Sequence, residues 1–329
     1  MFDGFSQVWT PVMLARNLRD RPVPVRIAGE DLVLFRDAQG NPAALVDRCP
    51  HRGVKLSLGK VKDGCIECPF HGWRFDGRGQ NVHVPFNPDA KRERLFARAL
   101  PVRQAGDLLF LFTSTDVLEP PELNVPKALT DPSMTRSYVE RTWRCHWTRA
   151  MENMLDSPHL PFVHRTTIGR PIAKTMTEHS KLDVEWEDTP WGGRQRSSVD
   201  GAPSTAHLDF YRPNMMALHI PMGPRRMEAL ALVIPVDART TRLIVVGARD
   251  FMRPRIFNPL FAKSNGIIAD QDRAVVESSQ PPEVPPPSHE VSVATDRATL
   301  AFRKYYFASL APEPARGLAV APLLRITQE

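Results

Sequence analysis

Three of the four cysteines in this chain, and two of its ten histidines, lie within thirty residues. This segment, 48–77, reads RCPHRGVKLSLGKVKDGCIECPFHGWRFDG. It places Cys49 two residues before His51, and Cys68 three residues before His71. Two thiolates and two imidazoles at such spacing form a metal-ligand set. The segment therefore predicts two tight loops that hold one metal centre between them.

Two kinds of metal centre accept this ligand set. Zinc binds two cysteines and two histidines tetrahedrally. A Rieske [2Fe–2S] centre uses two cysteines on one iron and two histidines on the other. The pairing of one cysteine with one histidine in each loop favours the cluster, because two similar loops can hold it from opposite sides. Both loops also contain Gly and Pro, namely Pro50, Gly53, Pro69 and Gly72. Such residues suit tight loops whose backbone N–H groups turn towards the sulfurs of a cluster.

The chain is long enough to carry a further domain. Its 329 residues exceed the usual size of a single core, so we expect about two domains. No apolar run approaches the ~20 residues of a membrane helix, and the start MFDGFSQVWTPV lacks the pattern of a secretory signal. Four cysteines do not make a disulfide framework. We therefore expect a protein of the reducing cytoplasm that makes no membrane contact.

The strand and helix patterns divide the chain into two domains. Short apolar runs broken by turns predict an all-β domain over residues 1–115. The polar, Pro-rich stretch that follows, 116–135, is expected to be a linker. Residues 136–329 predict an α+β domain with an antiparallel sheet. Its helices are expected at 147–157, 267–280 and 297–311, and its strands between 179 and 250.

A second group of candidate ligands lies in ENMLDSPHLPFVH, residues 152–164. His159 and His164 are five residues apart, or about 140° around an ideal helix, so an unbroken helix would separate them. Pro161 lies between them and can break or bend the helix, which would bring both imidazoles to one metal. Two histidines and one carboxylate suit a non-heme Fe(II) site with open positions. By itself, this spacing is equally typical of structural histidines.

Candidate carboxylates for the second site lie in ADQDRAVVE, residues 269–277, and beside the histidines. Asp270 and Asp272 are about 200° apart on a helix, so at most one of them faces the metal. Asp156 is a rival, because it lies three residues before His159 and would share its helix face. The spacing alone leaves this choice open.

These motifs resemble those of the Rieske non-heme iron oxygenases. CPHRG and CPFHGW are similar to the cluster loops of that family. Val54 and Phe70 stand where respiratory Rieske proteins usually carry an additional cysteine, so the oxygenase type fits better. The family motif N-x-x-D-x-x-H-x(4)-H is matched by Asn153, Asp156, His159 and His164. The resemblance extends over nearly the whole chain.

The resemblance implies a fold and a role for each motif residue. The implied fold is an N-terminal all-β Rieske domain followed by a helix-grip, START-like α+β catalytic domain. Asp156 is expected to bridge a cluster histidine of one subunit and an iron-ligand histidine of the next in a homotrimer, with Asn153 close to the ligands. The implied ligands are Cys49, His51, Cys68 and His71 for a [2Fe–2S] cluster, and His159, His164 and Asp272 for a mononuclear iron.

The resemblance also implies an activity. The compact length is similar to the branch that includes the vanillate and dicamba demethylases. We expect a terminal oxygenase that hydroxylates or demethylates a small aromatic or alkaloid-like substrate with O₂. No G-x-G-x-x-G motif is present, so a separate ferredoxin, an NAD(P)H reductase, or both must supply electrons. A ring cis-dihydroxylating dioxygenase and a non-catalytic Rieske electron carrier with a binding domain remain as alternatives.

Charge bears on the electron donor. Residues 1–115 hold 17 Lys and Arg against 12 Asp and Glu, and six of the basic residues flank the cluster loops: Arg48, Arg52, Lys55, Lys60, Lys62 and Arg74. They form either an ordinary solvated face or a surface that steers an acidic electron carrier. No basic and aromatic platform accompanies them, so nucleic-acid binding is not expected.

The substrate pocket is the least readable part of the sequence. Candidate lining residues lie in the strand region: Phe210, Asn214, Met216, His219 and Met227. Residues 251–266, FMRPRIFNPLFAKSNG, form either a mobile lid over the entrance or a static connection.

Overall fold

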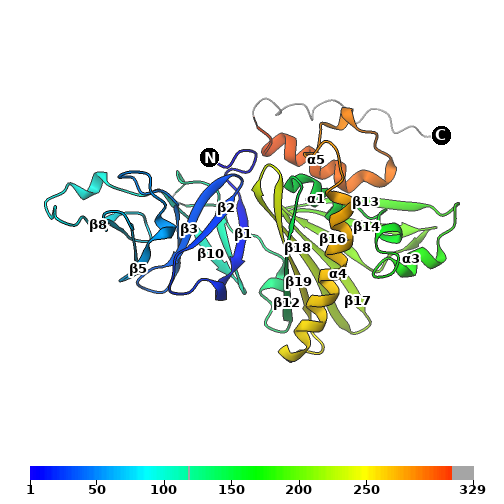
Figure 1. Cartoon of the computed structure of the whole chain (residues 1–329). Coiled ribbons are helices and arrows are strands. Elements are labelled where there is room, and N and C mark those ends of the chain that lie inside the picture. Colours follow the sequence, from blue (N-terminus) through cyan, green and yellow to red (C-terminus); the bar gives the residue numbers. More distant parts are fainter. Residues whose placement is uncertain (118, 313–329) are drawn as a thin grey trace. The chain divides into compact units, whose positions relative to one another are not determined.

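A computed structural model describes residues 1–117 and 119–312 (Figure 1). The chain forms two compact units, Met1–Leu123 and Asn124–Glu329. The boundary between the units falls inside the 116–135 stretch. The last part of the expected catalytic domain, 313–329, lies outside the described residues.

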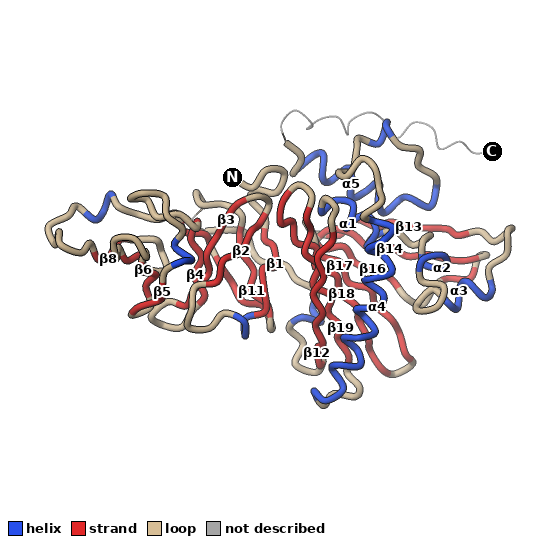
Figure 2. The backbone as a smooth tube through the Cα atoms, viewed as in Figure 1, coloured by secondary structure: helices blue, strands red, loops and turns tan. Residues whose placement is uncertain are grey.

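The N-terminal unit is built from antiparallel strands arranged in three small sheets (Figure 2). One sheet orders β1 (Trp9–Leu14), β11 (Leu108–Phe112) and β10 (Val102–Ala105). A second orders β2 (Val23–Ile27), β3 (Glu30–Arg36), β4 (Pro42–Val46) and β9 (Ala99–Leu100). The third orders β5 (Lys60–Lys62), β6 (Cys65–Glu67), β7 (Arg74–Phe75) and β8 (Asn81–His83). The two Cys/His loops join β4 to β5 and β6 to β7.

The C-terminal unit contains one eight-stranded antiparallel sheet. Its strand order is β12 (Thr135–Trp143), β19 (Thr240–Arg249), β18 (Arg225–Asp237), β17 (Met215–Met222), β16 (His207–Tyr211), β14 (Gly192–Val199) and β13 (Leu182–Thr189), with β15 (Ala202–Pro203) paired to β14. Successive side chains in a strand point to opposite faces. Met216, Leu218 and Ile220 of β17 therefore share one face with their cross-strand partners on β18.

Within the described part of the C-terminal unit there are five α-helices (Figure 1). They are α1 (Trp147–Leu155), α2 (Leu160–Val163), α3 (Arg170–Thr175), α4 (Asn258–Val276) and α5 (Arg297–Ser309). The long helix α4 packs along β12 and β19. Trp147 of α1 packs edge-to-face on Phe302 and Tyr306 of α5, which joins these two helices in one aromatic core. The predicted α+β class with an antiparallel sheet is confirmed.

One helix is longer than the sequence pattern indicates. The pattern places its start at residue 267, whereas α4 begins at Asn258. Pro259 lies in the first turn, where its missing N–H costs nothing. Gly266 weakens the helical signal, but it is buried against Arg141, whose guanidinium would lie 2.6 Å from an added Cβ. Residues 258–266 are therefore the first half of a packed helix.

Among the described residues, no helix has both the length and the apolar composition that a membrane crossing requires.

Candidate metal centres

The two Cys/His loops of the N-terminal unit share one backbone design. In the first loop the Cys49 N–H donates to the Val54 carbonyl, and the Gly53 N–H donates back to the Cys49 carbonyl, at 2.8 and 2.9 Å. In the second loop Cys68 and Gly72 repeat this pattern at 2.8 and 3.0 Å, with the Trp73 carbonyl as acceptor. Each glycine has a φ near +70°, which costs glycine little and other residues more. The sequence thus forms two matching loops.

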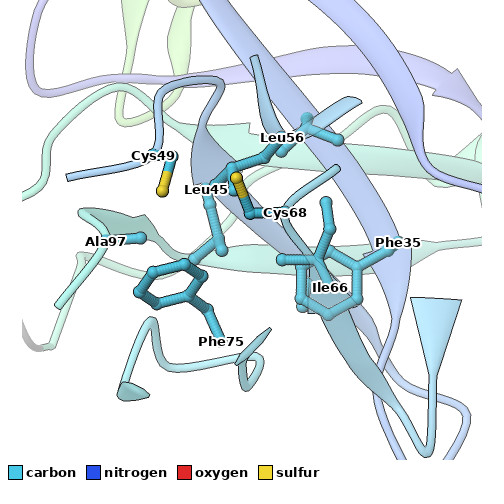
Figure 3. Packing of buried hydrophobic residues seen from close by; sticks show 10 residues of the cluster. Phe35, Leu45, Cys49, Leu56, Ile66, Cys68, Phe75 and Ala97 are labelled. Carbon is cyan, nitrogen blue, oxygen red and sulfur yellow. The ribbon is translucent and has the colours of Figure 1, made fainter. Parts of the chain in front are cut away.

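The loops bring all four predicted cluster ligands together. Cys49 and Cys68 are both 2% exposed and carry free thiols (Figure 3). The rings of His51 and His71 lie 4.7 Å apart, centroid to centroid. His51 is half-buried, and His71 is exposed. Both cysteines belong to an apolar cluster that also includes Phe35, Leu45, Leu56, Ile66 and Phe75 (Figure 3).

This donor set fits a [2Fe–2S] cluster. Burial, reinforced by the nearby Cys68, raises the pKa of the Cys49 thiol to about 11, so a thiolate here requires a compensating cation. His51 Nδ1 is buried and has no hydrogen-bond partner among the described residues, which is unusual unless the atom ligates a metal. Cys65 lies outside this group, with its Sγ 3.7 Å from the Asp63 carbonyl.

Trp73 is a functional candidate that the sequence reasoning missed. Its ring stacks on His51 with a centroid distance of 4.4 Å and an interplanar angle of 3°. The contact fixes the plane of the imidazole. The available signal was its position two residues after His71, in the motif CPFHGW.

A second group of ligand atoms gathers in the C-terminal unit. One ligand atom from each of His159, His164 and Asp272 lies within 4.8 Å of the other two. Asp272 Oδ1 is 2.9 Å from His164 Nε2 and 3.6 Å from His159 Nε2. Asp272 Oδ1 nevertheless forms no aligned hydrogen bond with any described residue. Three atoms that converge without bonding to one another fit a single non-heme iron with open positions.

Local breaks in the chain allow the two histidines to meet. Helix α1 ends at Leu155, and Asp156 has an extended backbone. His159 then caps the start of the short helix α2, and His164 caps its end. Pro161 lies in the first turn of α2, which it favours. The helix is therefore interrupted before His159, and not at Pro161 as the sequence suggested. Pro161 instead lies at the start of the new helix.

The far nitrogen of each imidazole is held by an oxygen acceptor. His159 Nδ1–H donates to Asp156 Oδ2 at 2.9 Å, and the His159 backbone N–H donates to the same oxygen at 3.0 Å. His164 Nδ1–H donates to Gln271 Oε1 at 2.9 Å. Thr167 donates to that Gln271 oxygen at 2.8 Å. These bonds leave both Nε2 atoms free for a metal.

Gln271 was not identified from the sequence. It directly precedes Asp272 on α4, so neighbouring residues of one helix turn supply a candidate ligand and the group that orients another ligand. An adjacent Gln and Asp in a surface-like helix gives little signal by itself.

Two of the three candidate carboxylates do not point towards the converging ligand atoms. Asp270 forms a two-pronged ion pair with Arg141, at 2.8 and 3.0 Å, on the exposed side of α4. Asp156 lies behind His159 rather than among the converging atoms. Asn153 is half-buried near these residues, and its Nδ2 has no partner among the described groups.

A third group of potential ligands does not suit a metal. His207, Asp209 and His219 also bring donor atoms within 4.8 Å. Arg194, however, occupies both Asp209 oxygens, at 2.6 and 2.8 Å. The rings of His207 and His219 stack face to face at 4.2 Å, so they cannot direct lone pairs to one ion. This group is a charge network of the sheet.

A cavity of about 900 Å³ reaches the His159–His164–Asp272 group. Residues of β17, β18 and β19 form one wall, and α4 contributes Asn265, Ile268 and Asp272. The volume lies near the upper end of the range for small-molecule sites.

Of the five pocket residues expected from the sequence, Met216 and Met227 line this cavity. Phe210 packs against Trp186, Phe302 and Tyr305 instead. Asn214 is fully buried and donates to the Val233 carbonyl, and His219 pairs with Asp209. The prediction is therefore wrong for these three residues. The lining depends on the face to which each side chain points and on the position of α5, and the sequence composition reveals neither. Met227 lines the cavity opposite Ile220.

Comparison with known families matches both units of the chain. Residues 8–100 match the family model "Rieske [2Fe-2S] domain". Residues 143–311 match "Vanillate O-demethylase oxygenase C-terminal domain". The first match favours the cluster over zinc for the Cys/His loops.

Similar curated proteins include oxygenases from several organisms. The methylxanthine N3-demethylase NdmB of Pseudomonas putida is 31% identical over 87% of this chain and 82% of its own length. The 4beta-methylsterol monooxygenase of Methylococcus capsulatus is 32% identical over 72% of this chain and 67% of its own. The chain spans only 53%, 30% and 41% of the first three relatives, among them the phenoxybenzoate dioxygenase subunit alpha of Ectopseudomonas oleovorans.

Similar solved structures cover nearly the whole chain. Pseudomonas putida CBB5 NdmB has a TM-score of 0.75 at 25% identity and covers 96% of this chain and 95% of its own. Dicamba monooxygenase bound to dicamba has a TM-score of 0.75 at 20% identity, over 91% and 96% of the two chains. The second likeness concerns the fold alone.

Proposed function

The chain belongs to the Rieske oxygenases whose C-terminal domain is of the vanillate O-demethylase oxygenase type, and on that premise we propose that it is the terminal oxygenase of a multicomponent system. The proposed reaction is monooxygenation of a small organic substrate by hydroxylation or by O- or N-demethylation. The named activities of relatives, such as methylxanthine demethylation and methylsterol monooxygenation, support this class.

The observation that carries the proposal is the convergence of His159, His164 and Asp272 at the cavity. A Rieske electron carrier needs the Cys/His loops alone. A second ligand group with two oriented imidazoles, open to a large cavity, has a use only where a substrate is held beside a metal.

The chain's own residues hold, orient and shield the reacting groups. We assign the cluster to Cys49, His51, Cys68 and His71, and the single iron to His159, His164 and Asp272. When bound, the cluster supplies single electrons and the iron supplies oxygen activation. Asp156 fixes His159 through two N–H donors, and Gln271 fixes His164. The largely apolar cavity wall excludes water from the substrate.

The proposed demethylation balances as follows. One oxygen atom of O₂ enters a C–H bond of a methyl group attached to O or N. The other oxygen atom leaves as water after uptake of two electrons and two protons. The hydroxymethyl product then breaks its C–O or C–N bond and releases formaldehyde and the demethylated substrate.

We propose that the chain forms a homotrimer and receives electrons from separate proteins. A separate ferredoxin, an NAD(P)H reductase, or both would deliver the electrons. His71 is exposed on the N-terminal unit, which suits it as the cluster histidine that faces a neighbouring subunit in a homotrimer. Asp156, 26% exposed at its side chain, would be its acceptor across that interface. The four free cysteines support a reducing cytoplasmic location.

The deciding experiment is substrate-dependent consumption of NADH and O₂ with a surrogate reductase. Methylated aromatics, N-methylated heterocycles and apolar ring compounds should be screened together, with formaldehyde and ¹⁸O incorporation from ¹⁸O₂ as readouts. We expect one labelled atom per product, or formaldehyde where a methyl group is lost. A cis-diol with two labelled atoms would indicate the dioxygenase alternative. About two irons per chain, with no third, would indicate the electron carrier.

A further inference from the structure

The wall of the cavity has an unusual charge pattern. The inward positions of the three central strands are apolar without exception: Met216, Leu218, Ile220, Met227, Ala229, Ala231, Leu243 and Val245. These residues are cross-strand neighbours in register, so they form one continuous surface. A substrate that lies against this wall meets no charge from the sheet.

The charges of the same sheet region lie on its other face. His219 is the partner of Glu228, and Asp209 is the partner of Arg194, at positions that alternate with the cavity residues. Arg194, Asp209, His219 and Glu228 form a nearly balanced group that pairs with itself. His207, at the cavity rim, stacks on His219. Burial and the neighbouring His219 lower the pKa of His207, so His207 adds no positive charge.

The remaining cations near the cavity are directed elsewhere. No arginine lines the cavity among the described residues, and the single lysine there, Lys181, points its Nζ to Asp183 at 3.2 Å with a side chain 77% exposed. Arg249, next to Met227 on the same face, is not part of the lining. Its Nη2 donates to the Met252 carbonyl and Asn258, and its guanidinium lies 3.9 Å from the Phe261 ring centre. Its Nε and Nη1 are buried and have no hydrogen-bond partner among the described residues.

Uncharged polar groups are available instead. Gln195 is 3% exposed, and it donates from Nε2 to Ser157 next to Asp156. Its Oε1 has no partner among the described residues. On the opposite wall, Asn265 lies seven residues before Asp272, and so on the same face of α4. These amides can hydrogen-bond a neutral group, but they cannot neutralise a charge.

We propose that the cavity selects an uncharged, largely apolar substrate and rejects carboxylates. A carboxylate held against this wall would lose its hydration and meet no cationic side chain that could replace it. This inference rests on the proposed function for the identity of the cavity as the substrate site. The preference of the cavity for uncharged molecules is a property of binding, and it can be measured without turnover.

The test uses three fluorescent probes of matched shape with the iron-loaded full chain. The probes are methyl 6-methoxy-2-naphthoate, 6-methoxy-2-naphthamide and the 6-methoxy-2-naphthoate anion, titrated at pH 7.5 without reductase. We expect the ester and the amide to bind at least roughly 100-fold more tightly than the acid. Anion binding within tenfold of the ester overturns the proposal, and so does failure of both neutral probes to bind.

A substituted wall provides the reverse experiment. Leu218→Lys places a cation at the centre of the apolar surface. It should reduce the ratio of the anion's Kd to the ester's Kd at least tenfold. Leu218→Met is the matched control and should leave the ratio unchanged. If Leu218→Lys does not fold, as judged by its thermal transition, the wild-type ratio still decides the matter. If the neutral probes bind more tightly than the anion and no oxygenase activity is found with any substrate, the proposed function fails, while the charge selectivity of the cavity is still supported.

Discussion

At the scale of single residues, the candidate iron site depends on groups that do not ligate. Each imidazole has two nitrogens, and a hydrogen bond at one decides which nitrogen is presented to a metal. Asp156 does this for His159, and Gln271 does it for His164. Removal of such a partner leaves the ligand present but poorly oriented.

Gln271 provides the clearest test of orientation. Gln271→Leu removes the acceptor for His164 Nδ1–H, and we expect iron affinity to fall about 10–100-fold. Competition with an Fe(II) chelator measures this loss. Gln271→Glu keeps an acceptor at the same length and should retain most of the affinity. Equal iron retention in wild type and Gln271→Leu would mean that the bond does not orient the ligand.

Asp270 and Asp272 form a matched pair on one helix. Asp272→Ala should reduce bound iron from about three to about two per chain, because the cluster irons are held in the other unit. Asp270→Ala should leave iron content unchanged and cost at most about 1 kcal/mol of stability, since its ion pair with Arg141 is largely exposed. Metal analysis and cluster absorbance of both variants measure the result. Loss of iron from Asp270→Ala instead would reverse the ligand assignment.

His219 makes stability depend on pH. Burial lowers the pKa of His219, but the hydrogen bonds that its imidazole donates to Asp209 and Glu228 outweigh burial and raise this pKa to about 9. The folded state therefore binds a proton more tightly than the unfolded state, whose histidine pKa is about 6.5. This stabilisation is complete below pH 6.5 and disappears as the pH rises through 9.

The expected contribution of His219 is at most about 3 kcal/mol. Denaturant unfolding at pH 6 and pH 9.5 should show wild type losing more stability than His219→Gln, which cannot titrate. Parallel pH profiles for the two proteins would show that His219 does not carry the effect.

At the scale of elements, the cluster loops depend on backbone geometry as much as on ligands. Gly53 and Gly72 occupy the left-handed region at equivalent points of the two loops, where each closes the hydrogen bond back to its cysteine. This geometry turns backbone N–H groups towards the space between the loops. The repetition explains why two short, unlike sequences form one site.

Gly72→Ala tests this geometry. An alanine at φ +70° costs about 1 kcal/mol, and its Cβ would lie 3.1 Å from the Pro85 ring. We expect a clear reduction of cluster per chain, measured by visible absorption and EPR. Gly40→Ala is the control, because Gly40 has φ +79° but nothing within 4 Å of an added Cβ. Gly40→Ala should introduce the same backbone strain but retain its cluster. An equal loss of cluster in both variants would show that backbone strain alone causes the effect.

At the scale of the whole molecule, the basic residues near the cluster loops could attract an acidic electron donor. Lys55, Lys60 and Arg74 pair with acidic residues of their own unit. Arg48, Arg52 and Lys62 are exposed and form no ion pair with a described residue. The structure therefore reduces the basic surface proposed from the sequence to these three positions.

Arg52→Glu together with Lys62→Glu should weaken coupling to an acidic ferredoxin. We expect the KM for the ferredoxin to rise roughly 3–10-fold at low salt and the difference to shrink as salt increases. Steady-state turnover at several salt concentrations measures this. Arg239→Glu, an exposed position of the C-terminal unit, makes the same kind of charge change and should have little effect. A salt-independent change would indicate damage to the cluster domain.

The sequence alone determined the local chemistry of this protein. Cys49, His51, Cys68 and His71 could be selected because metal ligands must be of few residue types and their loops are short. The three longer helices and most strands of the sheet followed from periodicity, although Gly266 concealed the first half of α4. The short helices α2 and α3 and the edge strand β12 were not predicted. His159, His164 and Asp272 were selected with help from a family resemblance, since their spacing by itself was open to other interpretations.

Only the tertiary structure decided which distant side chains share a space. Gln271 meets His164 because α4 packs along the sheet and presents adjacent residues to the site. His219 points to the other face of β17 because side chains alternate along a strand. Phe210 shares the face of its cross-strand partner Met216, but it packs against Phe302 of α5 instead of lining the cavity. Asn214 precedes β17 and is held by the Val233 carbonyl. Such contacts between segments far apart in the chain depend on register and burial, which composition does not encode.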